Sequence, residues 1–237
     1  MHVIPVTTPV LRPPQADLQA ALRLSLPSLL EGDVLVISSK VVSLDEGRCL
    51  PVVGSDKEAL IATEAELIIP RPYWNRPLTV ARHAFVGSAG IDESNGDGHY
   101  VLLPVDVFAS AQRLWQWVRA VYGLAQCGVI ISDSASAPFR LGASGIALAW
   151  WGIEPLRSHQ GRHDLFGRAI VAERSNVVDP LAAAAVLVGG EVDESTPVVI
   201  AREVPGLTYT DRDTRDQLLV PFTEDIFRVL YKRWLPS

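Results

Sequence analysis

The sequence predicts an α+β protein, in which helices and strands alternate irregularly around a shared core. Val34 to Ile37 and Gly128 to Ile131 are short, continuous apolar runs, typical of strands buried on both faces. Val107 to Tyr122 repeats apolar side chains at steps of three and four residues, as an amphipathic helix does. Because the segments do not repeat as regular strand–helix–strand units, they favour an α+β fold over a doubly wound sheet.

The first half of the chain contains five further patterned segments. Apolar side chains recur on one face of Ala16 to Leu26, and Pro27 is expected to end that helix. Gly32-Asp33 then predicts a turn before the first buried strand. The other segments are a short strand at Val3 to Val6, a helix at Lys57 to Ile68, and strands at Leu78 to Val86 and Tyr100 to Leu103.

The second half is harder to interpret, because small residues interrupt its patterns. Ser132-Asp133 is expected to halt the strand that begins at Gly128, and Ser134 to Gly167 predicts loops with short elements, since it is rich in Gly, Ala, Ser and Pro. Later segments are a strand at Ala169 to Ala172, a helix at Asp179 to Val188 stopped by Gly189-Gly190, a strand at Pro197 to Ala201, and a closing helix at Thr223 to Trp234 with Thr223 as its cap.

Composition argues against several classes of protein. The formal net charge is −6, and the 18 Arg and 3 Lys form no basic run, which disfavours nucleic-acid binding. No apolar stretch approaches the roughly 20 residues of a membrane-spanning helix, and the N-terminus lacks the pattern of a signal peptide. Cys49 and Cys127 fit reduced thiols of a cytoplasmic protein, with a single bridge as the alternative. The chain also lacks a G-x-x-x-x-G-K-[ST] phosphate loop and a dinucleotide fingerprint.

The segment Gly90 to Asn95 gathers side-chain oxygens directly after an apolar run. Hard cations such as Mg²⁺ and Mn²⁺ prefer oxygen ligands, commonly one or two carboxylates together with substrate phosphates. Asp92 is therefore a candidate metal ligand, and Asn95 a candidate contact for a base or sugar. The alternative is a polar surface turn capped by its own side chains.

Two further carboxylates are candidates for the same centre. Asp133 and Ser134 follow a buried strand, and the carboxyl end of a strand commonly faces a ligand crevice. The alternative role for Asp133 is a helix cap. Glu191 follows Gly189-Gly190 and is a solvated surface residue by default, unless the fold returns it to Asp92 and Asp133.

Basic residues near these acids could contact phosphate. Lys40 follows a buried strand in Ser38-Ser39-Lys40, where it could bind phosphate or simply be a solvated strand end. Arg162 lies in the turn Gly161 to Gly167, where it could bind a carboxylate or phosphate with two hydrogen bonds, or pair with Asp164.

Leu78 to Asn95, which reads LTVARHAFVGSAGIDESN, resembles the central motif of the coenzyme F-420:L-glutamate ligases, the gamma-glutamyl ligases of deazaflavin coenzyme biosynthesis. The A-G-I-D-E-S-N portion is its most specific part. Other segments agree with the family in order and spacing, so that the similarity covers nearly the whole chain. They are Gly32 to Gly47, Gly128 to Arg140, Gly161 to Gly167, Gly189 to Pro197 and Pro221 to Arg228.

The resemblance implies a cytoplasmic enzyme that uses GTP and two divalent ions, Mg²⁺ or Mn²⁺, with K⁺ as a further candidate ion. It would join L-glutamate to a carboxylate of the phosphate-linked deazaflavin precursor through an acyl phosphate. By motif match, the metal positions are Asp92, Asp133, Ser134 and Glu191. The nucleotide positions are Ser39, Lys40, Asn95 and the segment Pro5 to Pro9, including Pro5 and Val6. The catalytic positions are Asp92, Asp133 and Arg162.

The resemblance also implies a gamma-glutamyl ligase-like fold of mixed sheets and helices, with residues 1–237 as one domain. Two interleaved subdomains are expected within it, one from roughly residues 1–80 with 170–237 and the other from residues 81–169. Members of the family form intertwined homodimers, so a homodimer with small-molecule substrates is the expectation here, without nucleic-acid or membrane partners.

The chain departs from the family pattern at two phosphate-facing positions. The family usually has a second lysine where this chain reads Ser43-Leu44, and its arginine after Asp133 is replaced by Ala137. Both changes remove positive charge. The glycine that precedes this arginine in the family is replaced by Ser136. These departures leave two alternatives open. The first is a ligase of the same fold that joins another carboxylate to another amine. The second is a non-catalytic protein that binds nucleotide and metal.

Overall fold

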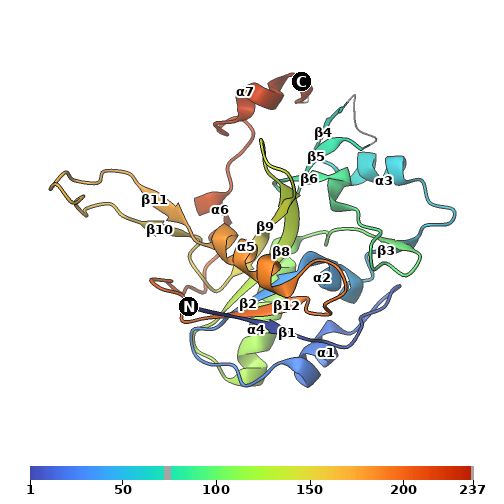
Figure 1. The fold of residues 1–237 in the computed structure, drawn as a ribbon, viewed down its shortest axis with the longest axis horizontal. Coiled ribbons are helices and arrows are strands. Elements are labelled where there is room, and N and C mark those ends of the chain that lie inside the picture. The colour runs from blue at the N-terminus through green and yellow to red at the C-terminus, as the bar shows by residue number, and fades with distance from the viewer. Residues whose placement is uncertain (72–75, 236–237) are drawn as a thin grey trace.

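The computed structural model describes residues 1–71 and 76–235, and its centre is a five-stranded mixed sheet. The strand order is β1-β12-β2-β8-β9, and β2 and β8 are its parallel pair, while the other neighbours run antiparallel. The bounds are β1 (His2–Val6), β2 (Val34–Ser38), β8 (Gly128–Ser136), β9 (Ala143–Trp151) and β12 (Val198–Arg202). Figure 1 shows this sheet in the middle of the molecule.

Two helices cover the central sheet. They are α4 (Val107–Tyr122), which packs on β8 and β9, and α5 (Val178–Gly189), which packs on β9, β1, β12 and β8. α4 begins where the Asp106 side chain accepts hydrogen bonds from the N–H groups of Phe108 and Ala109, and it ends at Gly123 in the left-handed conformation. β2 is buried from Val34 to Ile37, because side chains from both of its faces enter the core.

Smaller units surround the sheet. β4 (Leu67–Ile69), β5 (Leu78–Ala81) and β6 (Ala84–Gly87) form a three-stranded antiparallel sheet, and β3 (Cys49–Pro51) pairs with β7 (His99–Val101). β10 (Leu156–Ser158) and β11 (Arg174–Asn176) begin an arm that projects from the body (Figure 1). The remaining helices are α1 (Leu18–Ser25), α2 (Ser39–Asp45), α3 (Lys57–Glu64), α6 (Arg215–Leu218) and α7 (Arg228–Tyr231), with 3₁₀ turns at Ser88–Gly90 and Lys232–Trp234.

The α+β class is confirmed, and several elements match the sequence prediction closely. α4 has the predicted bounds, α1 lies inside Ala16 to Leu26, and the first strand, both buried central strands and the last sheet strand are present. Two segments divide further than predicted. The helix from Lys57 ends at Glu64, with Leu67–Ile69 as a strand, and Leu78 to Val86 is a hairpin that turns at Arg82 and His83.

Four predictions in the second half are wrong. The strand from Gly128 does not halt at Ser132-Asp133 but continues to Ser136, because β9 pairs with it. Ser134 to Gly167, predicted as loops with short elements, therefore contains the nine-residue strand β9. Ala169 to Ala172 is not a strand. The closing helix is reduced to α7 and one 3₁₀ turn, and Thr223 caps neither, because α7 begins only at Arg228. Tyr231 packs this segment against the small β4-β5-β6 sheet.

A buried ion pair fixes the end of the central sheet at which β2 begins. The Asp33 side chain is fully buried, and Arg202 of β12 donates to it through Nε at 2.8 Å and Nη2 at 2.7 Å. The Leu30 N–H donates to the same carboxylate at 2.8 Å. Cys127 and Cys49 are both free thiols. Within the described part of the chain, no helix combines the length and apolar character that crossing a membrane would need.

Candidate active site

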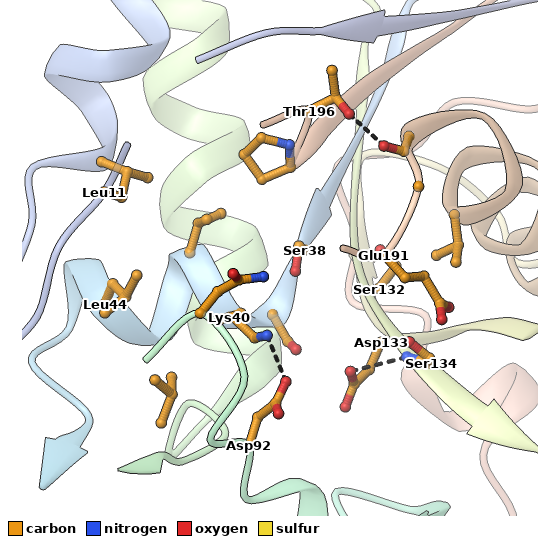
Figure 2. A pocket seen from close by; sticks show the side chains of 18 of the residues that line it. Leu11, Ser38, Lys40, Leu44, Asp92, Ser132, Asp133, Ser134, Glu191 and Thr196 are labelled. Carbon is orange, nitrogen blue, oxygen red and sulfur yellow. Dashed lines mark hydrogen bonds and ion pairs between the residues drawn. The ribbon is translucent and has the colours of Figure 1, made fainter. Parts of the chain in front are cut away.

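A cavity of about 550 Å³ lies at the opposite end of the sheet, where the parallel strands β2 and β8 end. Segments far apart in the sequence line it, as Figure 2 shows. Its polar side gathers most of the candidate residues. They are Ser39, Lys40, Asp92, Asn95, Asp133, Ser134 and Glu191. Its apolar lining includes Leu11, Val41, Leu44, Leu102 and Leu103.

Helix α2 presents the first group of side chains to the cavity. It begins at Ser39, directly after β2 ends, so no loop separates strand and helix. Ser39, Lys40, Ser43 and Leu44 all line the cavity from this helix. The Ser43 hydroxyl is buried and has no hydrogen-bond partner among the described residues. Sequence reasoning missed this helix, because its seven residues carry no side-chain cap.

The turn that carries Asp92 is built from its own hydrogen bonds. The Asp92 Oδ1 accepts from the N–H of Glu93 at 2.8 Å, from the N–H of Ser94 at 3.1 Å and from the Ser94 hydroxyl at 2.9 Å. Gly96 closes the turn against His99, where an added Cβ would lie 2.2 Å from the carbonyl oxygen. The turn therefore demands glycine at this position. The self-capped polar turn and the cavity-facing carboxylate, which the sequence presents as alternatives, occur together.

Lys40 and Asp92 form an ion pair inside the cavity, with Nζ 2.6 Å from Oδ2 (Figure 2). The Lys40 Nζ also donates to the carbonyl oxygen of Ser94 at 2.9 Å. Burial by itself raises the pKa of Asp92, but the hydrogen bond and charge of Lys40, together with Ser94, outweigh it, so the pKa lies below its usual value. Asp92 is thus ionised, and Lys40 is within reach of any anion that enters.

Asp133 is the second carboxylate of the cavity, and it faces Asp92 in Figure 2. The pKa of Asp133 is raised to about 6, because burial and the charge of Asp92 raise it by more than its other neighbours lower it. The groups that lower it are the Ser134 N–H, which donates at 2.9 Å, the charge of Lys40 and the Ser39 hydroxyl. Within residues 1–71 and 76–235, no lysine or arginine forms a salt bridge with this side chain. The negative charge of Asp133 is therefore only partly compensated, by the Ser134 N–H, the Ser39 hydroxyl and the more distant charge of Lys40.

The loop after α5 forms the third side of the cavity. The Glu191 side chain is exposed and extends toward Asp133 and Ser134 in Figure 2. Asn95 donates through Nδ2 to the carbonyl oxygen of Val192 at 2.7 Å, which ties the Asp92 turn to this loop. The fold thus returns Glu191 to the same cavity as the other two acids, which is the condition under which the sequence makes it a candidate ligand.

Three candidate residues lie outside the cavity. Pro5 and Val6 belong to β1 and pair with Val199 and Val198, while the chain that follows them, Thr8 to Leu11, lines the cavity instead. Arg162 is exposed on the projecting arm, 3.4 Å from a His159 nitrogen. Of the two departures from the motif, Leu44 is buried in the cavity wall and Ala137 is exposed in the β8–β9 connection.

The donor set fits a hard divalent cation, although the side chains do not converge on one point. Among residues 1–71 and 76–235, no three His, Cys, Asp or Glu side chains are close enough to share a metal ion. Asp92 and Asp133 nevertheless supply facing carboxylates, with the Ser134 hydroxyl beside them, and oxygen ligands of this kind suit Mg²⁺ and Mn²⁺. The only partly compensated charge of Asp133 supports the same interpretation.

Comparison with known proteins gives consistent matches. The family model described as F420-0:Gamma-glutamyl ligase matches residues 55–203. The coenzyme F420:L-glutamate ligase of Methanothermobacter thermautotrophicus is 37% identical over 221 residues, covering 84% of this chain and 86% of the relative. The proteins of that name from Halorubrum lacusprofundi and Methanocaldococcus jannaschii are each 34% identical, covering 87% and 84% of this chain and 88% and 85% of the relatives.

Proposed function

This chain belongs to the F420-0:gamma-glutamyl ligase family, and on that premise we propose that it is a ligase of coenzyme F420 biosynthesis. Its reaction would use GTP and a divalent cation to join L-glutamate to a carboxylate of the phosphate-linked deazaflavin precursor. The observation that carries the proposal is the cavity in which Lys40, Asp92 and Asp133 meet.

The proposed reaction proceeds in two steps. A carboxylate oxygen of the precursor attacks the γ-phosphorus of GTP, so that an acyl phosphate forms and GDP leaves. The glutamate amine then attacks the acyl carbon, the amide bond forms, and inorganic phosphate and a proton leave. Lys40 would contact a phosphate oxygen as a point charge, because its ammonium already lies in the cavity beside Asp92.

Asp92, Asp133, Ser134 and Glu191 are the residues that would hold Mg²⁺ or Mn²⁺. Such an ion, when bound, neutralises negative charge on the phosphoryl group and its leaving group. Cavities of roughly 300 to 1,000 Å³ suit small ligands, and this one is of about 550 Å³. Leu11 and Leu44 give it an apolar surface for a flat ring on the side away from Asp133 and Glu191 (Figure 2). Ser39 and Asn95 would contact the nucleotide from α2 and the Asp92 turn.

The proposal includes an intertwined homodimer, with the two interleaved subdomains and the cytoplasmic location expected from the family. Phe139, Leu141, Leu165 and Phe166 are almost fully exposed on two projecting segments, and large apolar side chains of this kind favour a protein partner. A second copy of the chain is the simplest partner to propose. K⁺ stays a candidate ion. A catalytic role of Arg162 would require the projecting arm to reach a site other than the cavity of its own chain.

The test is an assay of the pure protein with GTP, Mn²⁺, L-glutamate and the deazaflavin precursor. We expect a glutamylated product and one phosphate released for each product. The Asp133→Asn variant should lose at least about 99% of this activity, since loss of a metal ligand removes charge stabilisation in phosphoryl transfer. Absence of both product and phosphate release in the unchanged protein would reject the proposal.

A second candidate is a ligase of the same fold for another carboxylate and amine. Leu44 supports it, because an apolar side chain in the cavity wall replaces a lysine of the family motif. Phosphate release that starts only with a different acid or amine would favour this candidate. Nucleotide binding without any release would instead indicate a non-catalytic protein.

A further inference from the structure

Lys57 occupies an unusually unfavourable position for a charged side chain. It is the first residue of α3, where the helix dipole disfavours a cation. Its Nζ is shielded from solvent and has no hydrogen-bond partner among the described residues. Burial lowers the pKa of Lys57, and the charge of Arg76 lowers it further. A methionine of similar length would avoid all of these costs, so the ammonium requires an explanation.

The groups that attract this ammonium lie on the turn that carries Asp92 and on β7, which pairs with that turn. The Lys57 Nζ is 3.9 Å from Glu93 Oε2 and 4.8 Å from the ring centre of Tyr100. Tyr100 precedes Val101, whose backbone exchanges two hydrogen bonds with Asp92, at 2.9 and 2.8 Å. Glu93 directly follows Asp92. Lys57 therefore contacts both strands of chain that hold the backbone of Asp92.

Two of the three lysines of the chain thus hold one turn from different sides. Lys40 holds it from within the cavity, through Asp92 and Ser94. Lys57 holds it through Glu93, and it is not among the residues that line the cavity. A cation or phosphate that takes Lys40 away from Asp92 would leave Lys57 as the remaining lysine contact of the turn.

We infer that Lys57 is a positioning residue, which keeps the Asp92 carboxylate directed at Asp133 when Lys40 is drawn to a bound anion. The inference rests on the proposed function for its purpose, while the tether itself can be tested without substrate. Lys57 does not touch the reacting atoms, so its effect would pass through Glu93 and Tyr100 to the Asp92 turn.

The decisive experiment measures Mn²⁺ affinity by electron paramagnetic resonance in Lys57→Met, Glu93→Gln and the double variant. Coulomb's law alone predicts tighter Mn²⁺ binding in Lys57→Met, because a nearby positive charge is removed. A positioning role predicts the opposite, about tenfold weaker binding, as is typical when a group that orients a metal ligand is lost. Lys57→Met and Glu93→Gln break the same contact, that between Lys57 and Glu93. The double variant should therefore bind Mn²⁺ no more weakly than Lys57→Met.

Two further measurements separate positioning from general destabilisation. The melting temperature of Lys57→Met should stay unchanged or rise, since shielding an ammonium without a hydrogen bond costs more than its 3.9 Å contact with the partly exposed Glu93 returns. In the metal-free protein, amide exchange of Glu93, Ser94 and Gly96 should become faster. The matched control is Lys232→Met, which removes the third lysine, exposed near the C-terminus, and should change none of these quantities.

Each alternative result would overturn the inference. Three results would each exclude a positioning role of Lys57. The first is Mn²⁺ binding in Lys57→Met that is as tight as in the unchanged protein or tighter, and the second is additive effects of the two substitutions on Mn²⁺ affinity. The third is a fall in both the melting temperature and the Mn²⁺ affinity of Lys57→Met. Unchanged amide exchange in the turn would exclude the tether whatever the metal result. If the unchanged protein takes up no Mn²⁺, the proposed function fails, and the exchange measurement still decides the tether separately.

Discussion

Two aspartates at opposite ends of the same parallel strand pair differ in how far the chain compensates their negative charge. Asp33 precedes β2 and receives two hydrogen bonds from Arg202 and one from the Leu30 N–H, so its charge is satisfied within the chain. Asp133 lies toward the other end of β8 and faces another carboxylate, that of Asp92. It has the Ser134 N–H, the Ser39 hydroxyl and the charge of Lys40 as compensation, but no salt bridge of its own among the described residues. The difference separates a carboxylate that stabilises the fold from one left open to a ligand.

The largest effect should follow from breaking the satisfied pair. Arg202→Met leaves the Asp33 carboxylate buried without its cation, which costs about 3 to 5 kcal/mol in the free energy of unfolding. Urea denaturation monitored by Trp fluorescence measures this change. Activity per folded molecule should stay unchanged, because Arg202 lies at the far end of the sheet. A loss below about 1 kcal/mol would show that the pair does not carry the stability assigned to it.

A smaller change in the free energy of unfolding, of opposite sign, should follow from substituting Asp133 at the cavity end of the sheet. Asp133→Asn removes an acid whose pKa is raised to about 6, so the wild-type protein loses stability as the pH rises through the range between its ordinary pKa and about 6. The metal-free variant should be more stable by about 1 to 2 kcal/mol near about pH 8, and equal to wild type near about pH 4.

Chemical denaturation in the presence of a chelator, repeated at both pH values, checks this prediction. An excess of Mn²⁺ should reverse the order at the higher pH, because only the wild-type site gains binding energy. Equal stability of the two metal-free proteins at every pH would mean that the Asp133 charge is compensated after all.

The smallest effect should come from a carboxylate whose partner is exposed. Asp97 forms a salt bridge with Arg12 at 3.1 Å, and both side chains are about two-thirds exposed. Asp97→Asn should change the free energy of unfolding by less than about 0.5 kcal/mol, because water screens the pair. The same denaturation series measures it. A loss comparable to that of Arg202→Met would show that burial is not what distinguishes the two pairs.

Parts of the fold that depend on local chemistry could be predicted from sequence. α4 carries both its helical pattern and its caps, Asp106 and Gly123, within its own segment. β9 could not be predicted, because its small residues resemble a loop. They serve a different purpose, since a Cβ on Gly145 would lie 2.3 Å from the carbonyl oxygen of Ala182 in α5. The small residues allow a close approach between strand and helix, which only the tertiary structure shows.

The candidate site also contains residues that the sequence could predict and residues that it could not. Asp92, Asp133 and Glu191 carry recognisable motifs, and the fold brings them to one cavity. Lys57 has no motif, because its relation to the Asp92 turn arises only when α3 packs beside Glu93 and Tyr100. The arm that carries Arg162 lies outside the cavity of its own chain, and no local pattern in that segment indicates its position.

The most direct test is a crystal of the protein grown with Mn²⁺ and GTP, measured by anomalous scattering at the manganese edge. We expect a manganese peak within about 2.5 Å of carboxylate oxygens from both Asp92 and Asp133, with the Lys40 ammonium moved from Asp92 to a phosphate oxygen. A nucleotide-bound crystal without manganese at these carboxylates, and with Lys40 still paired to Asp92, would contradict the proposed centre.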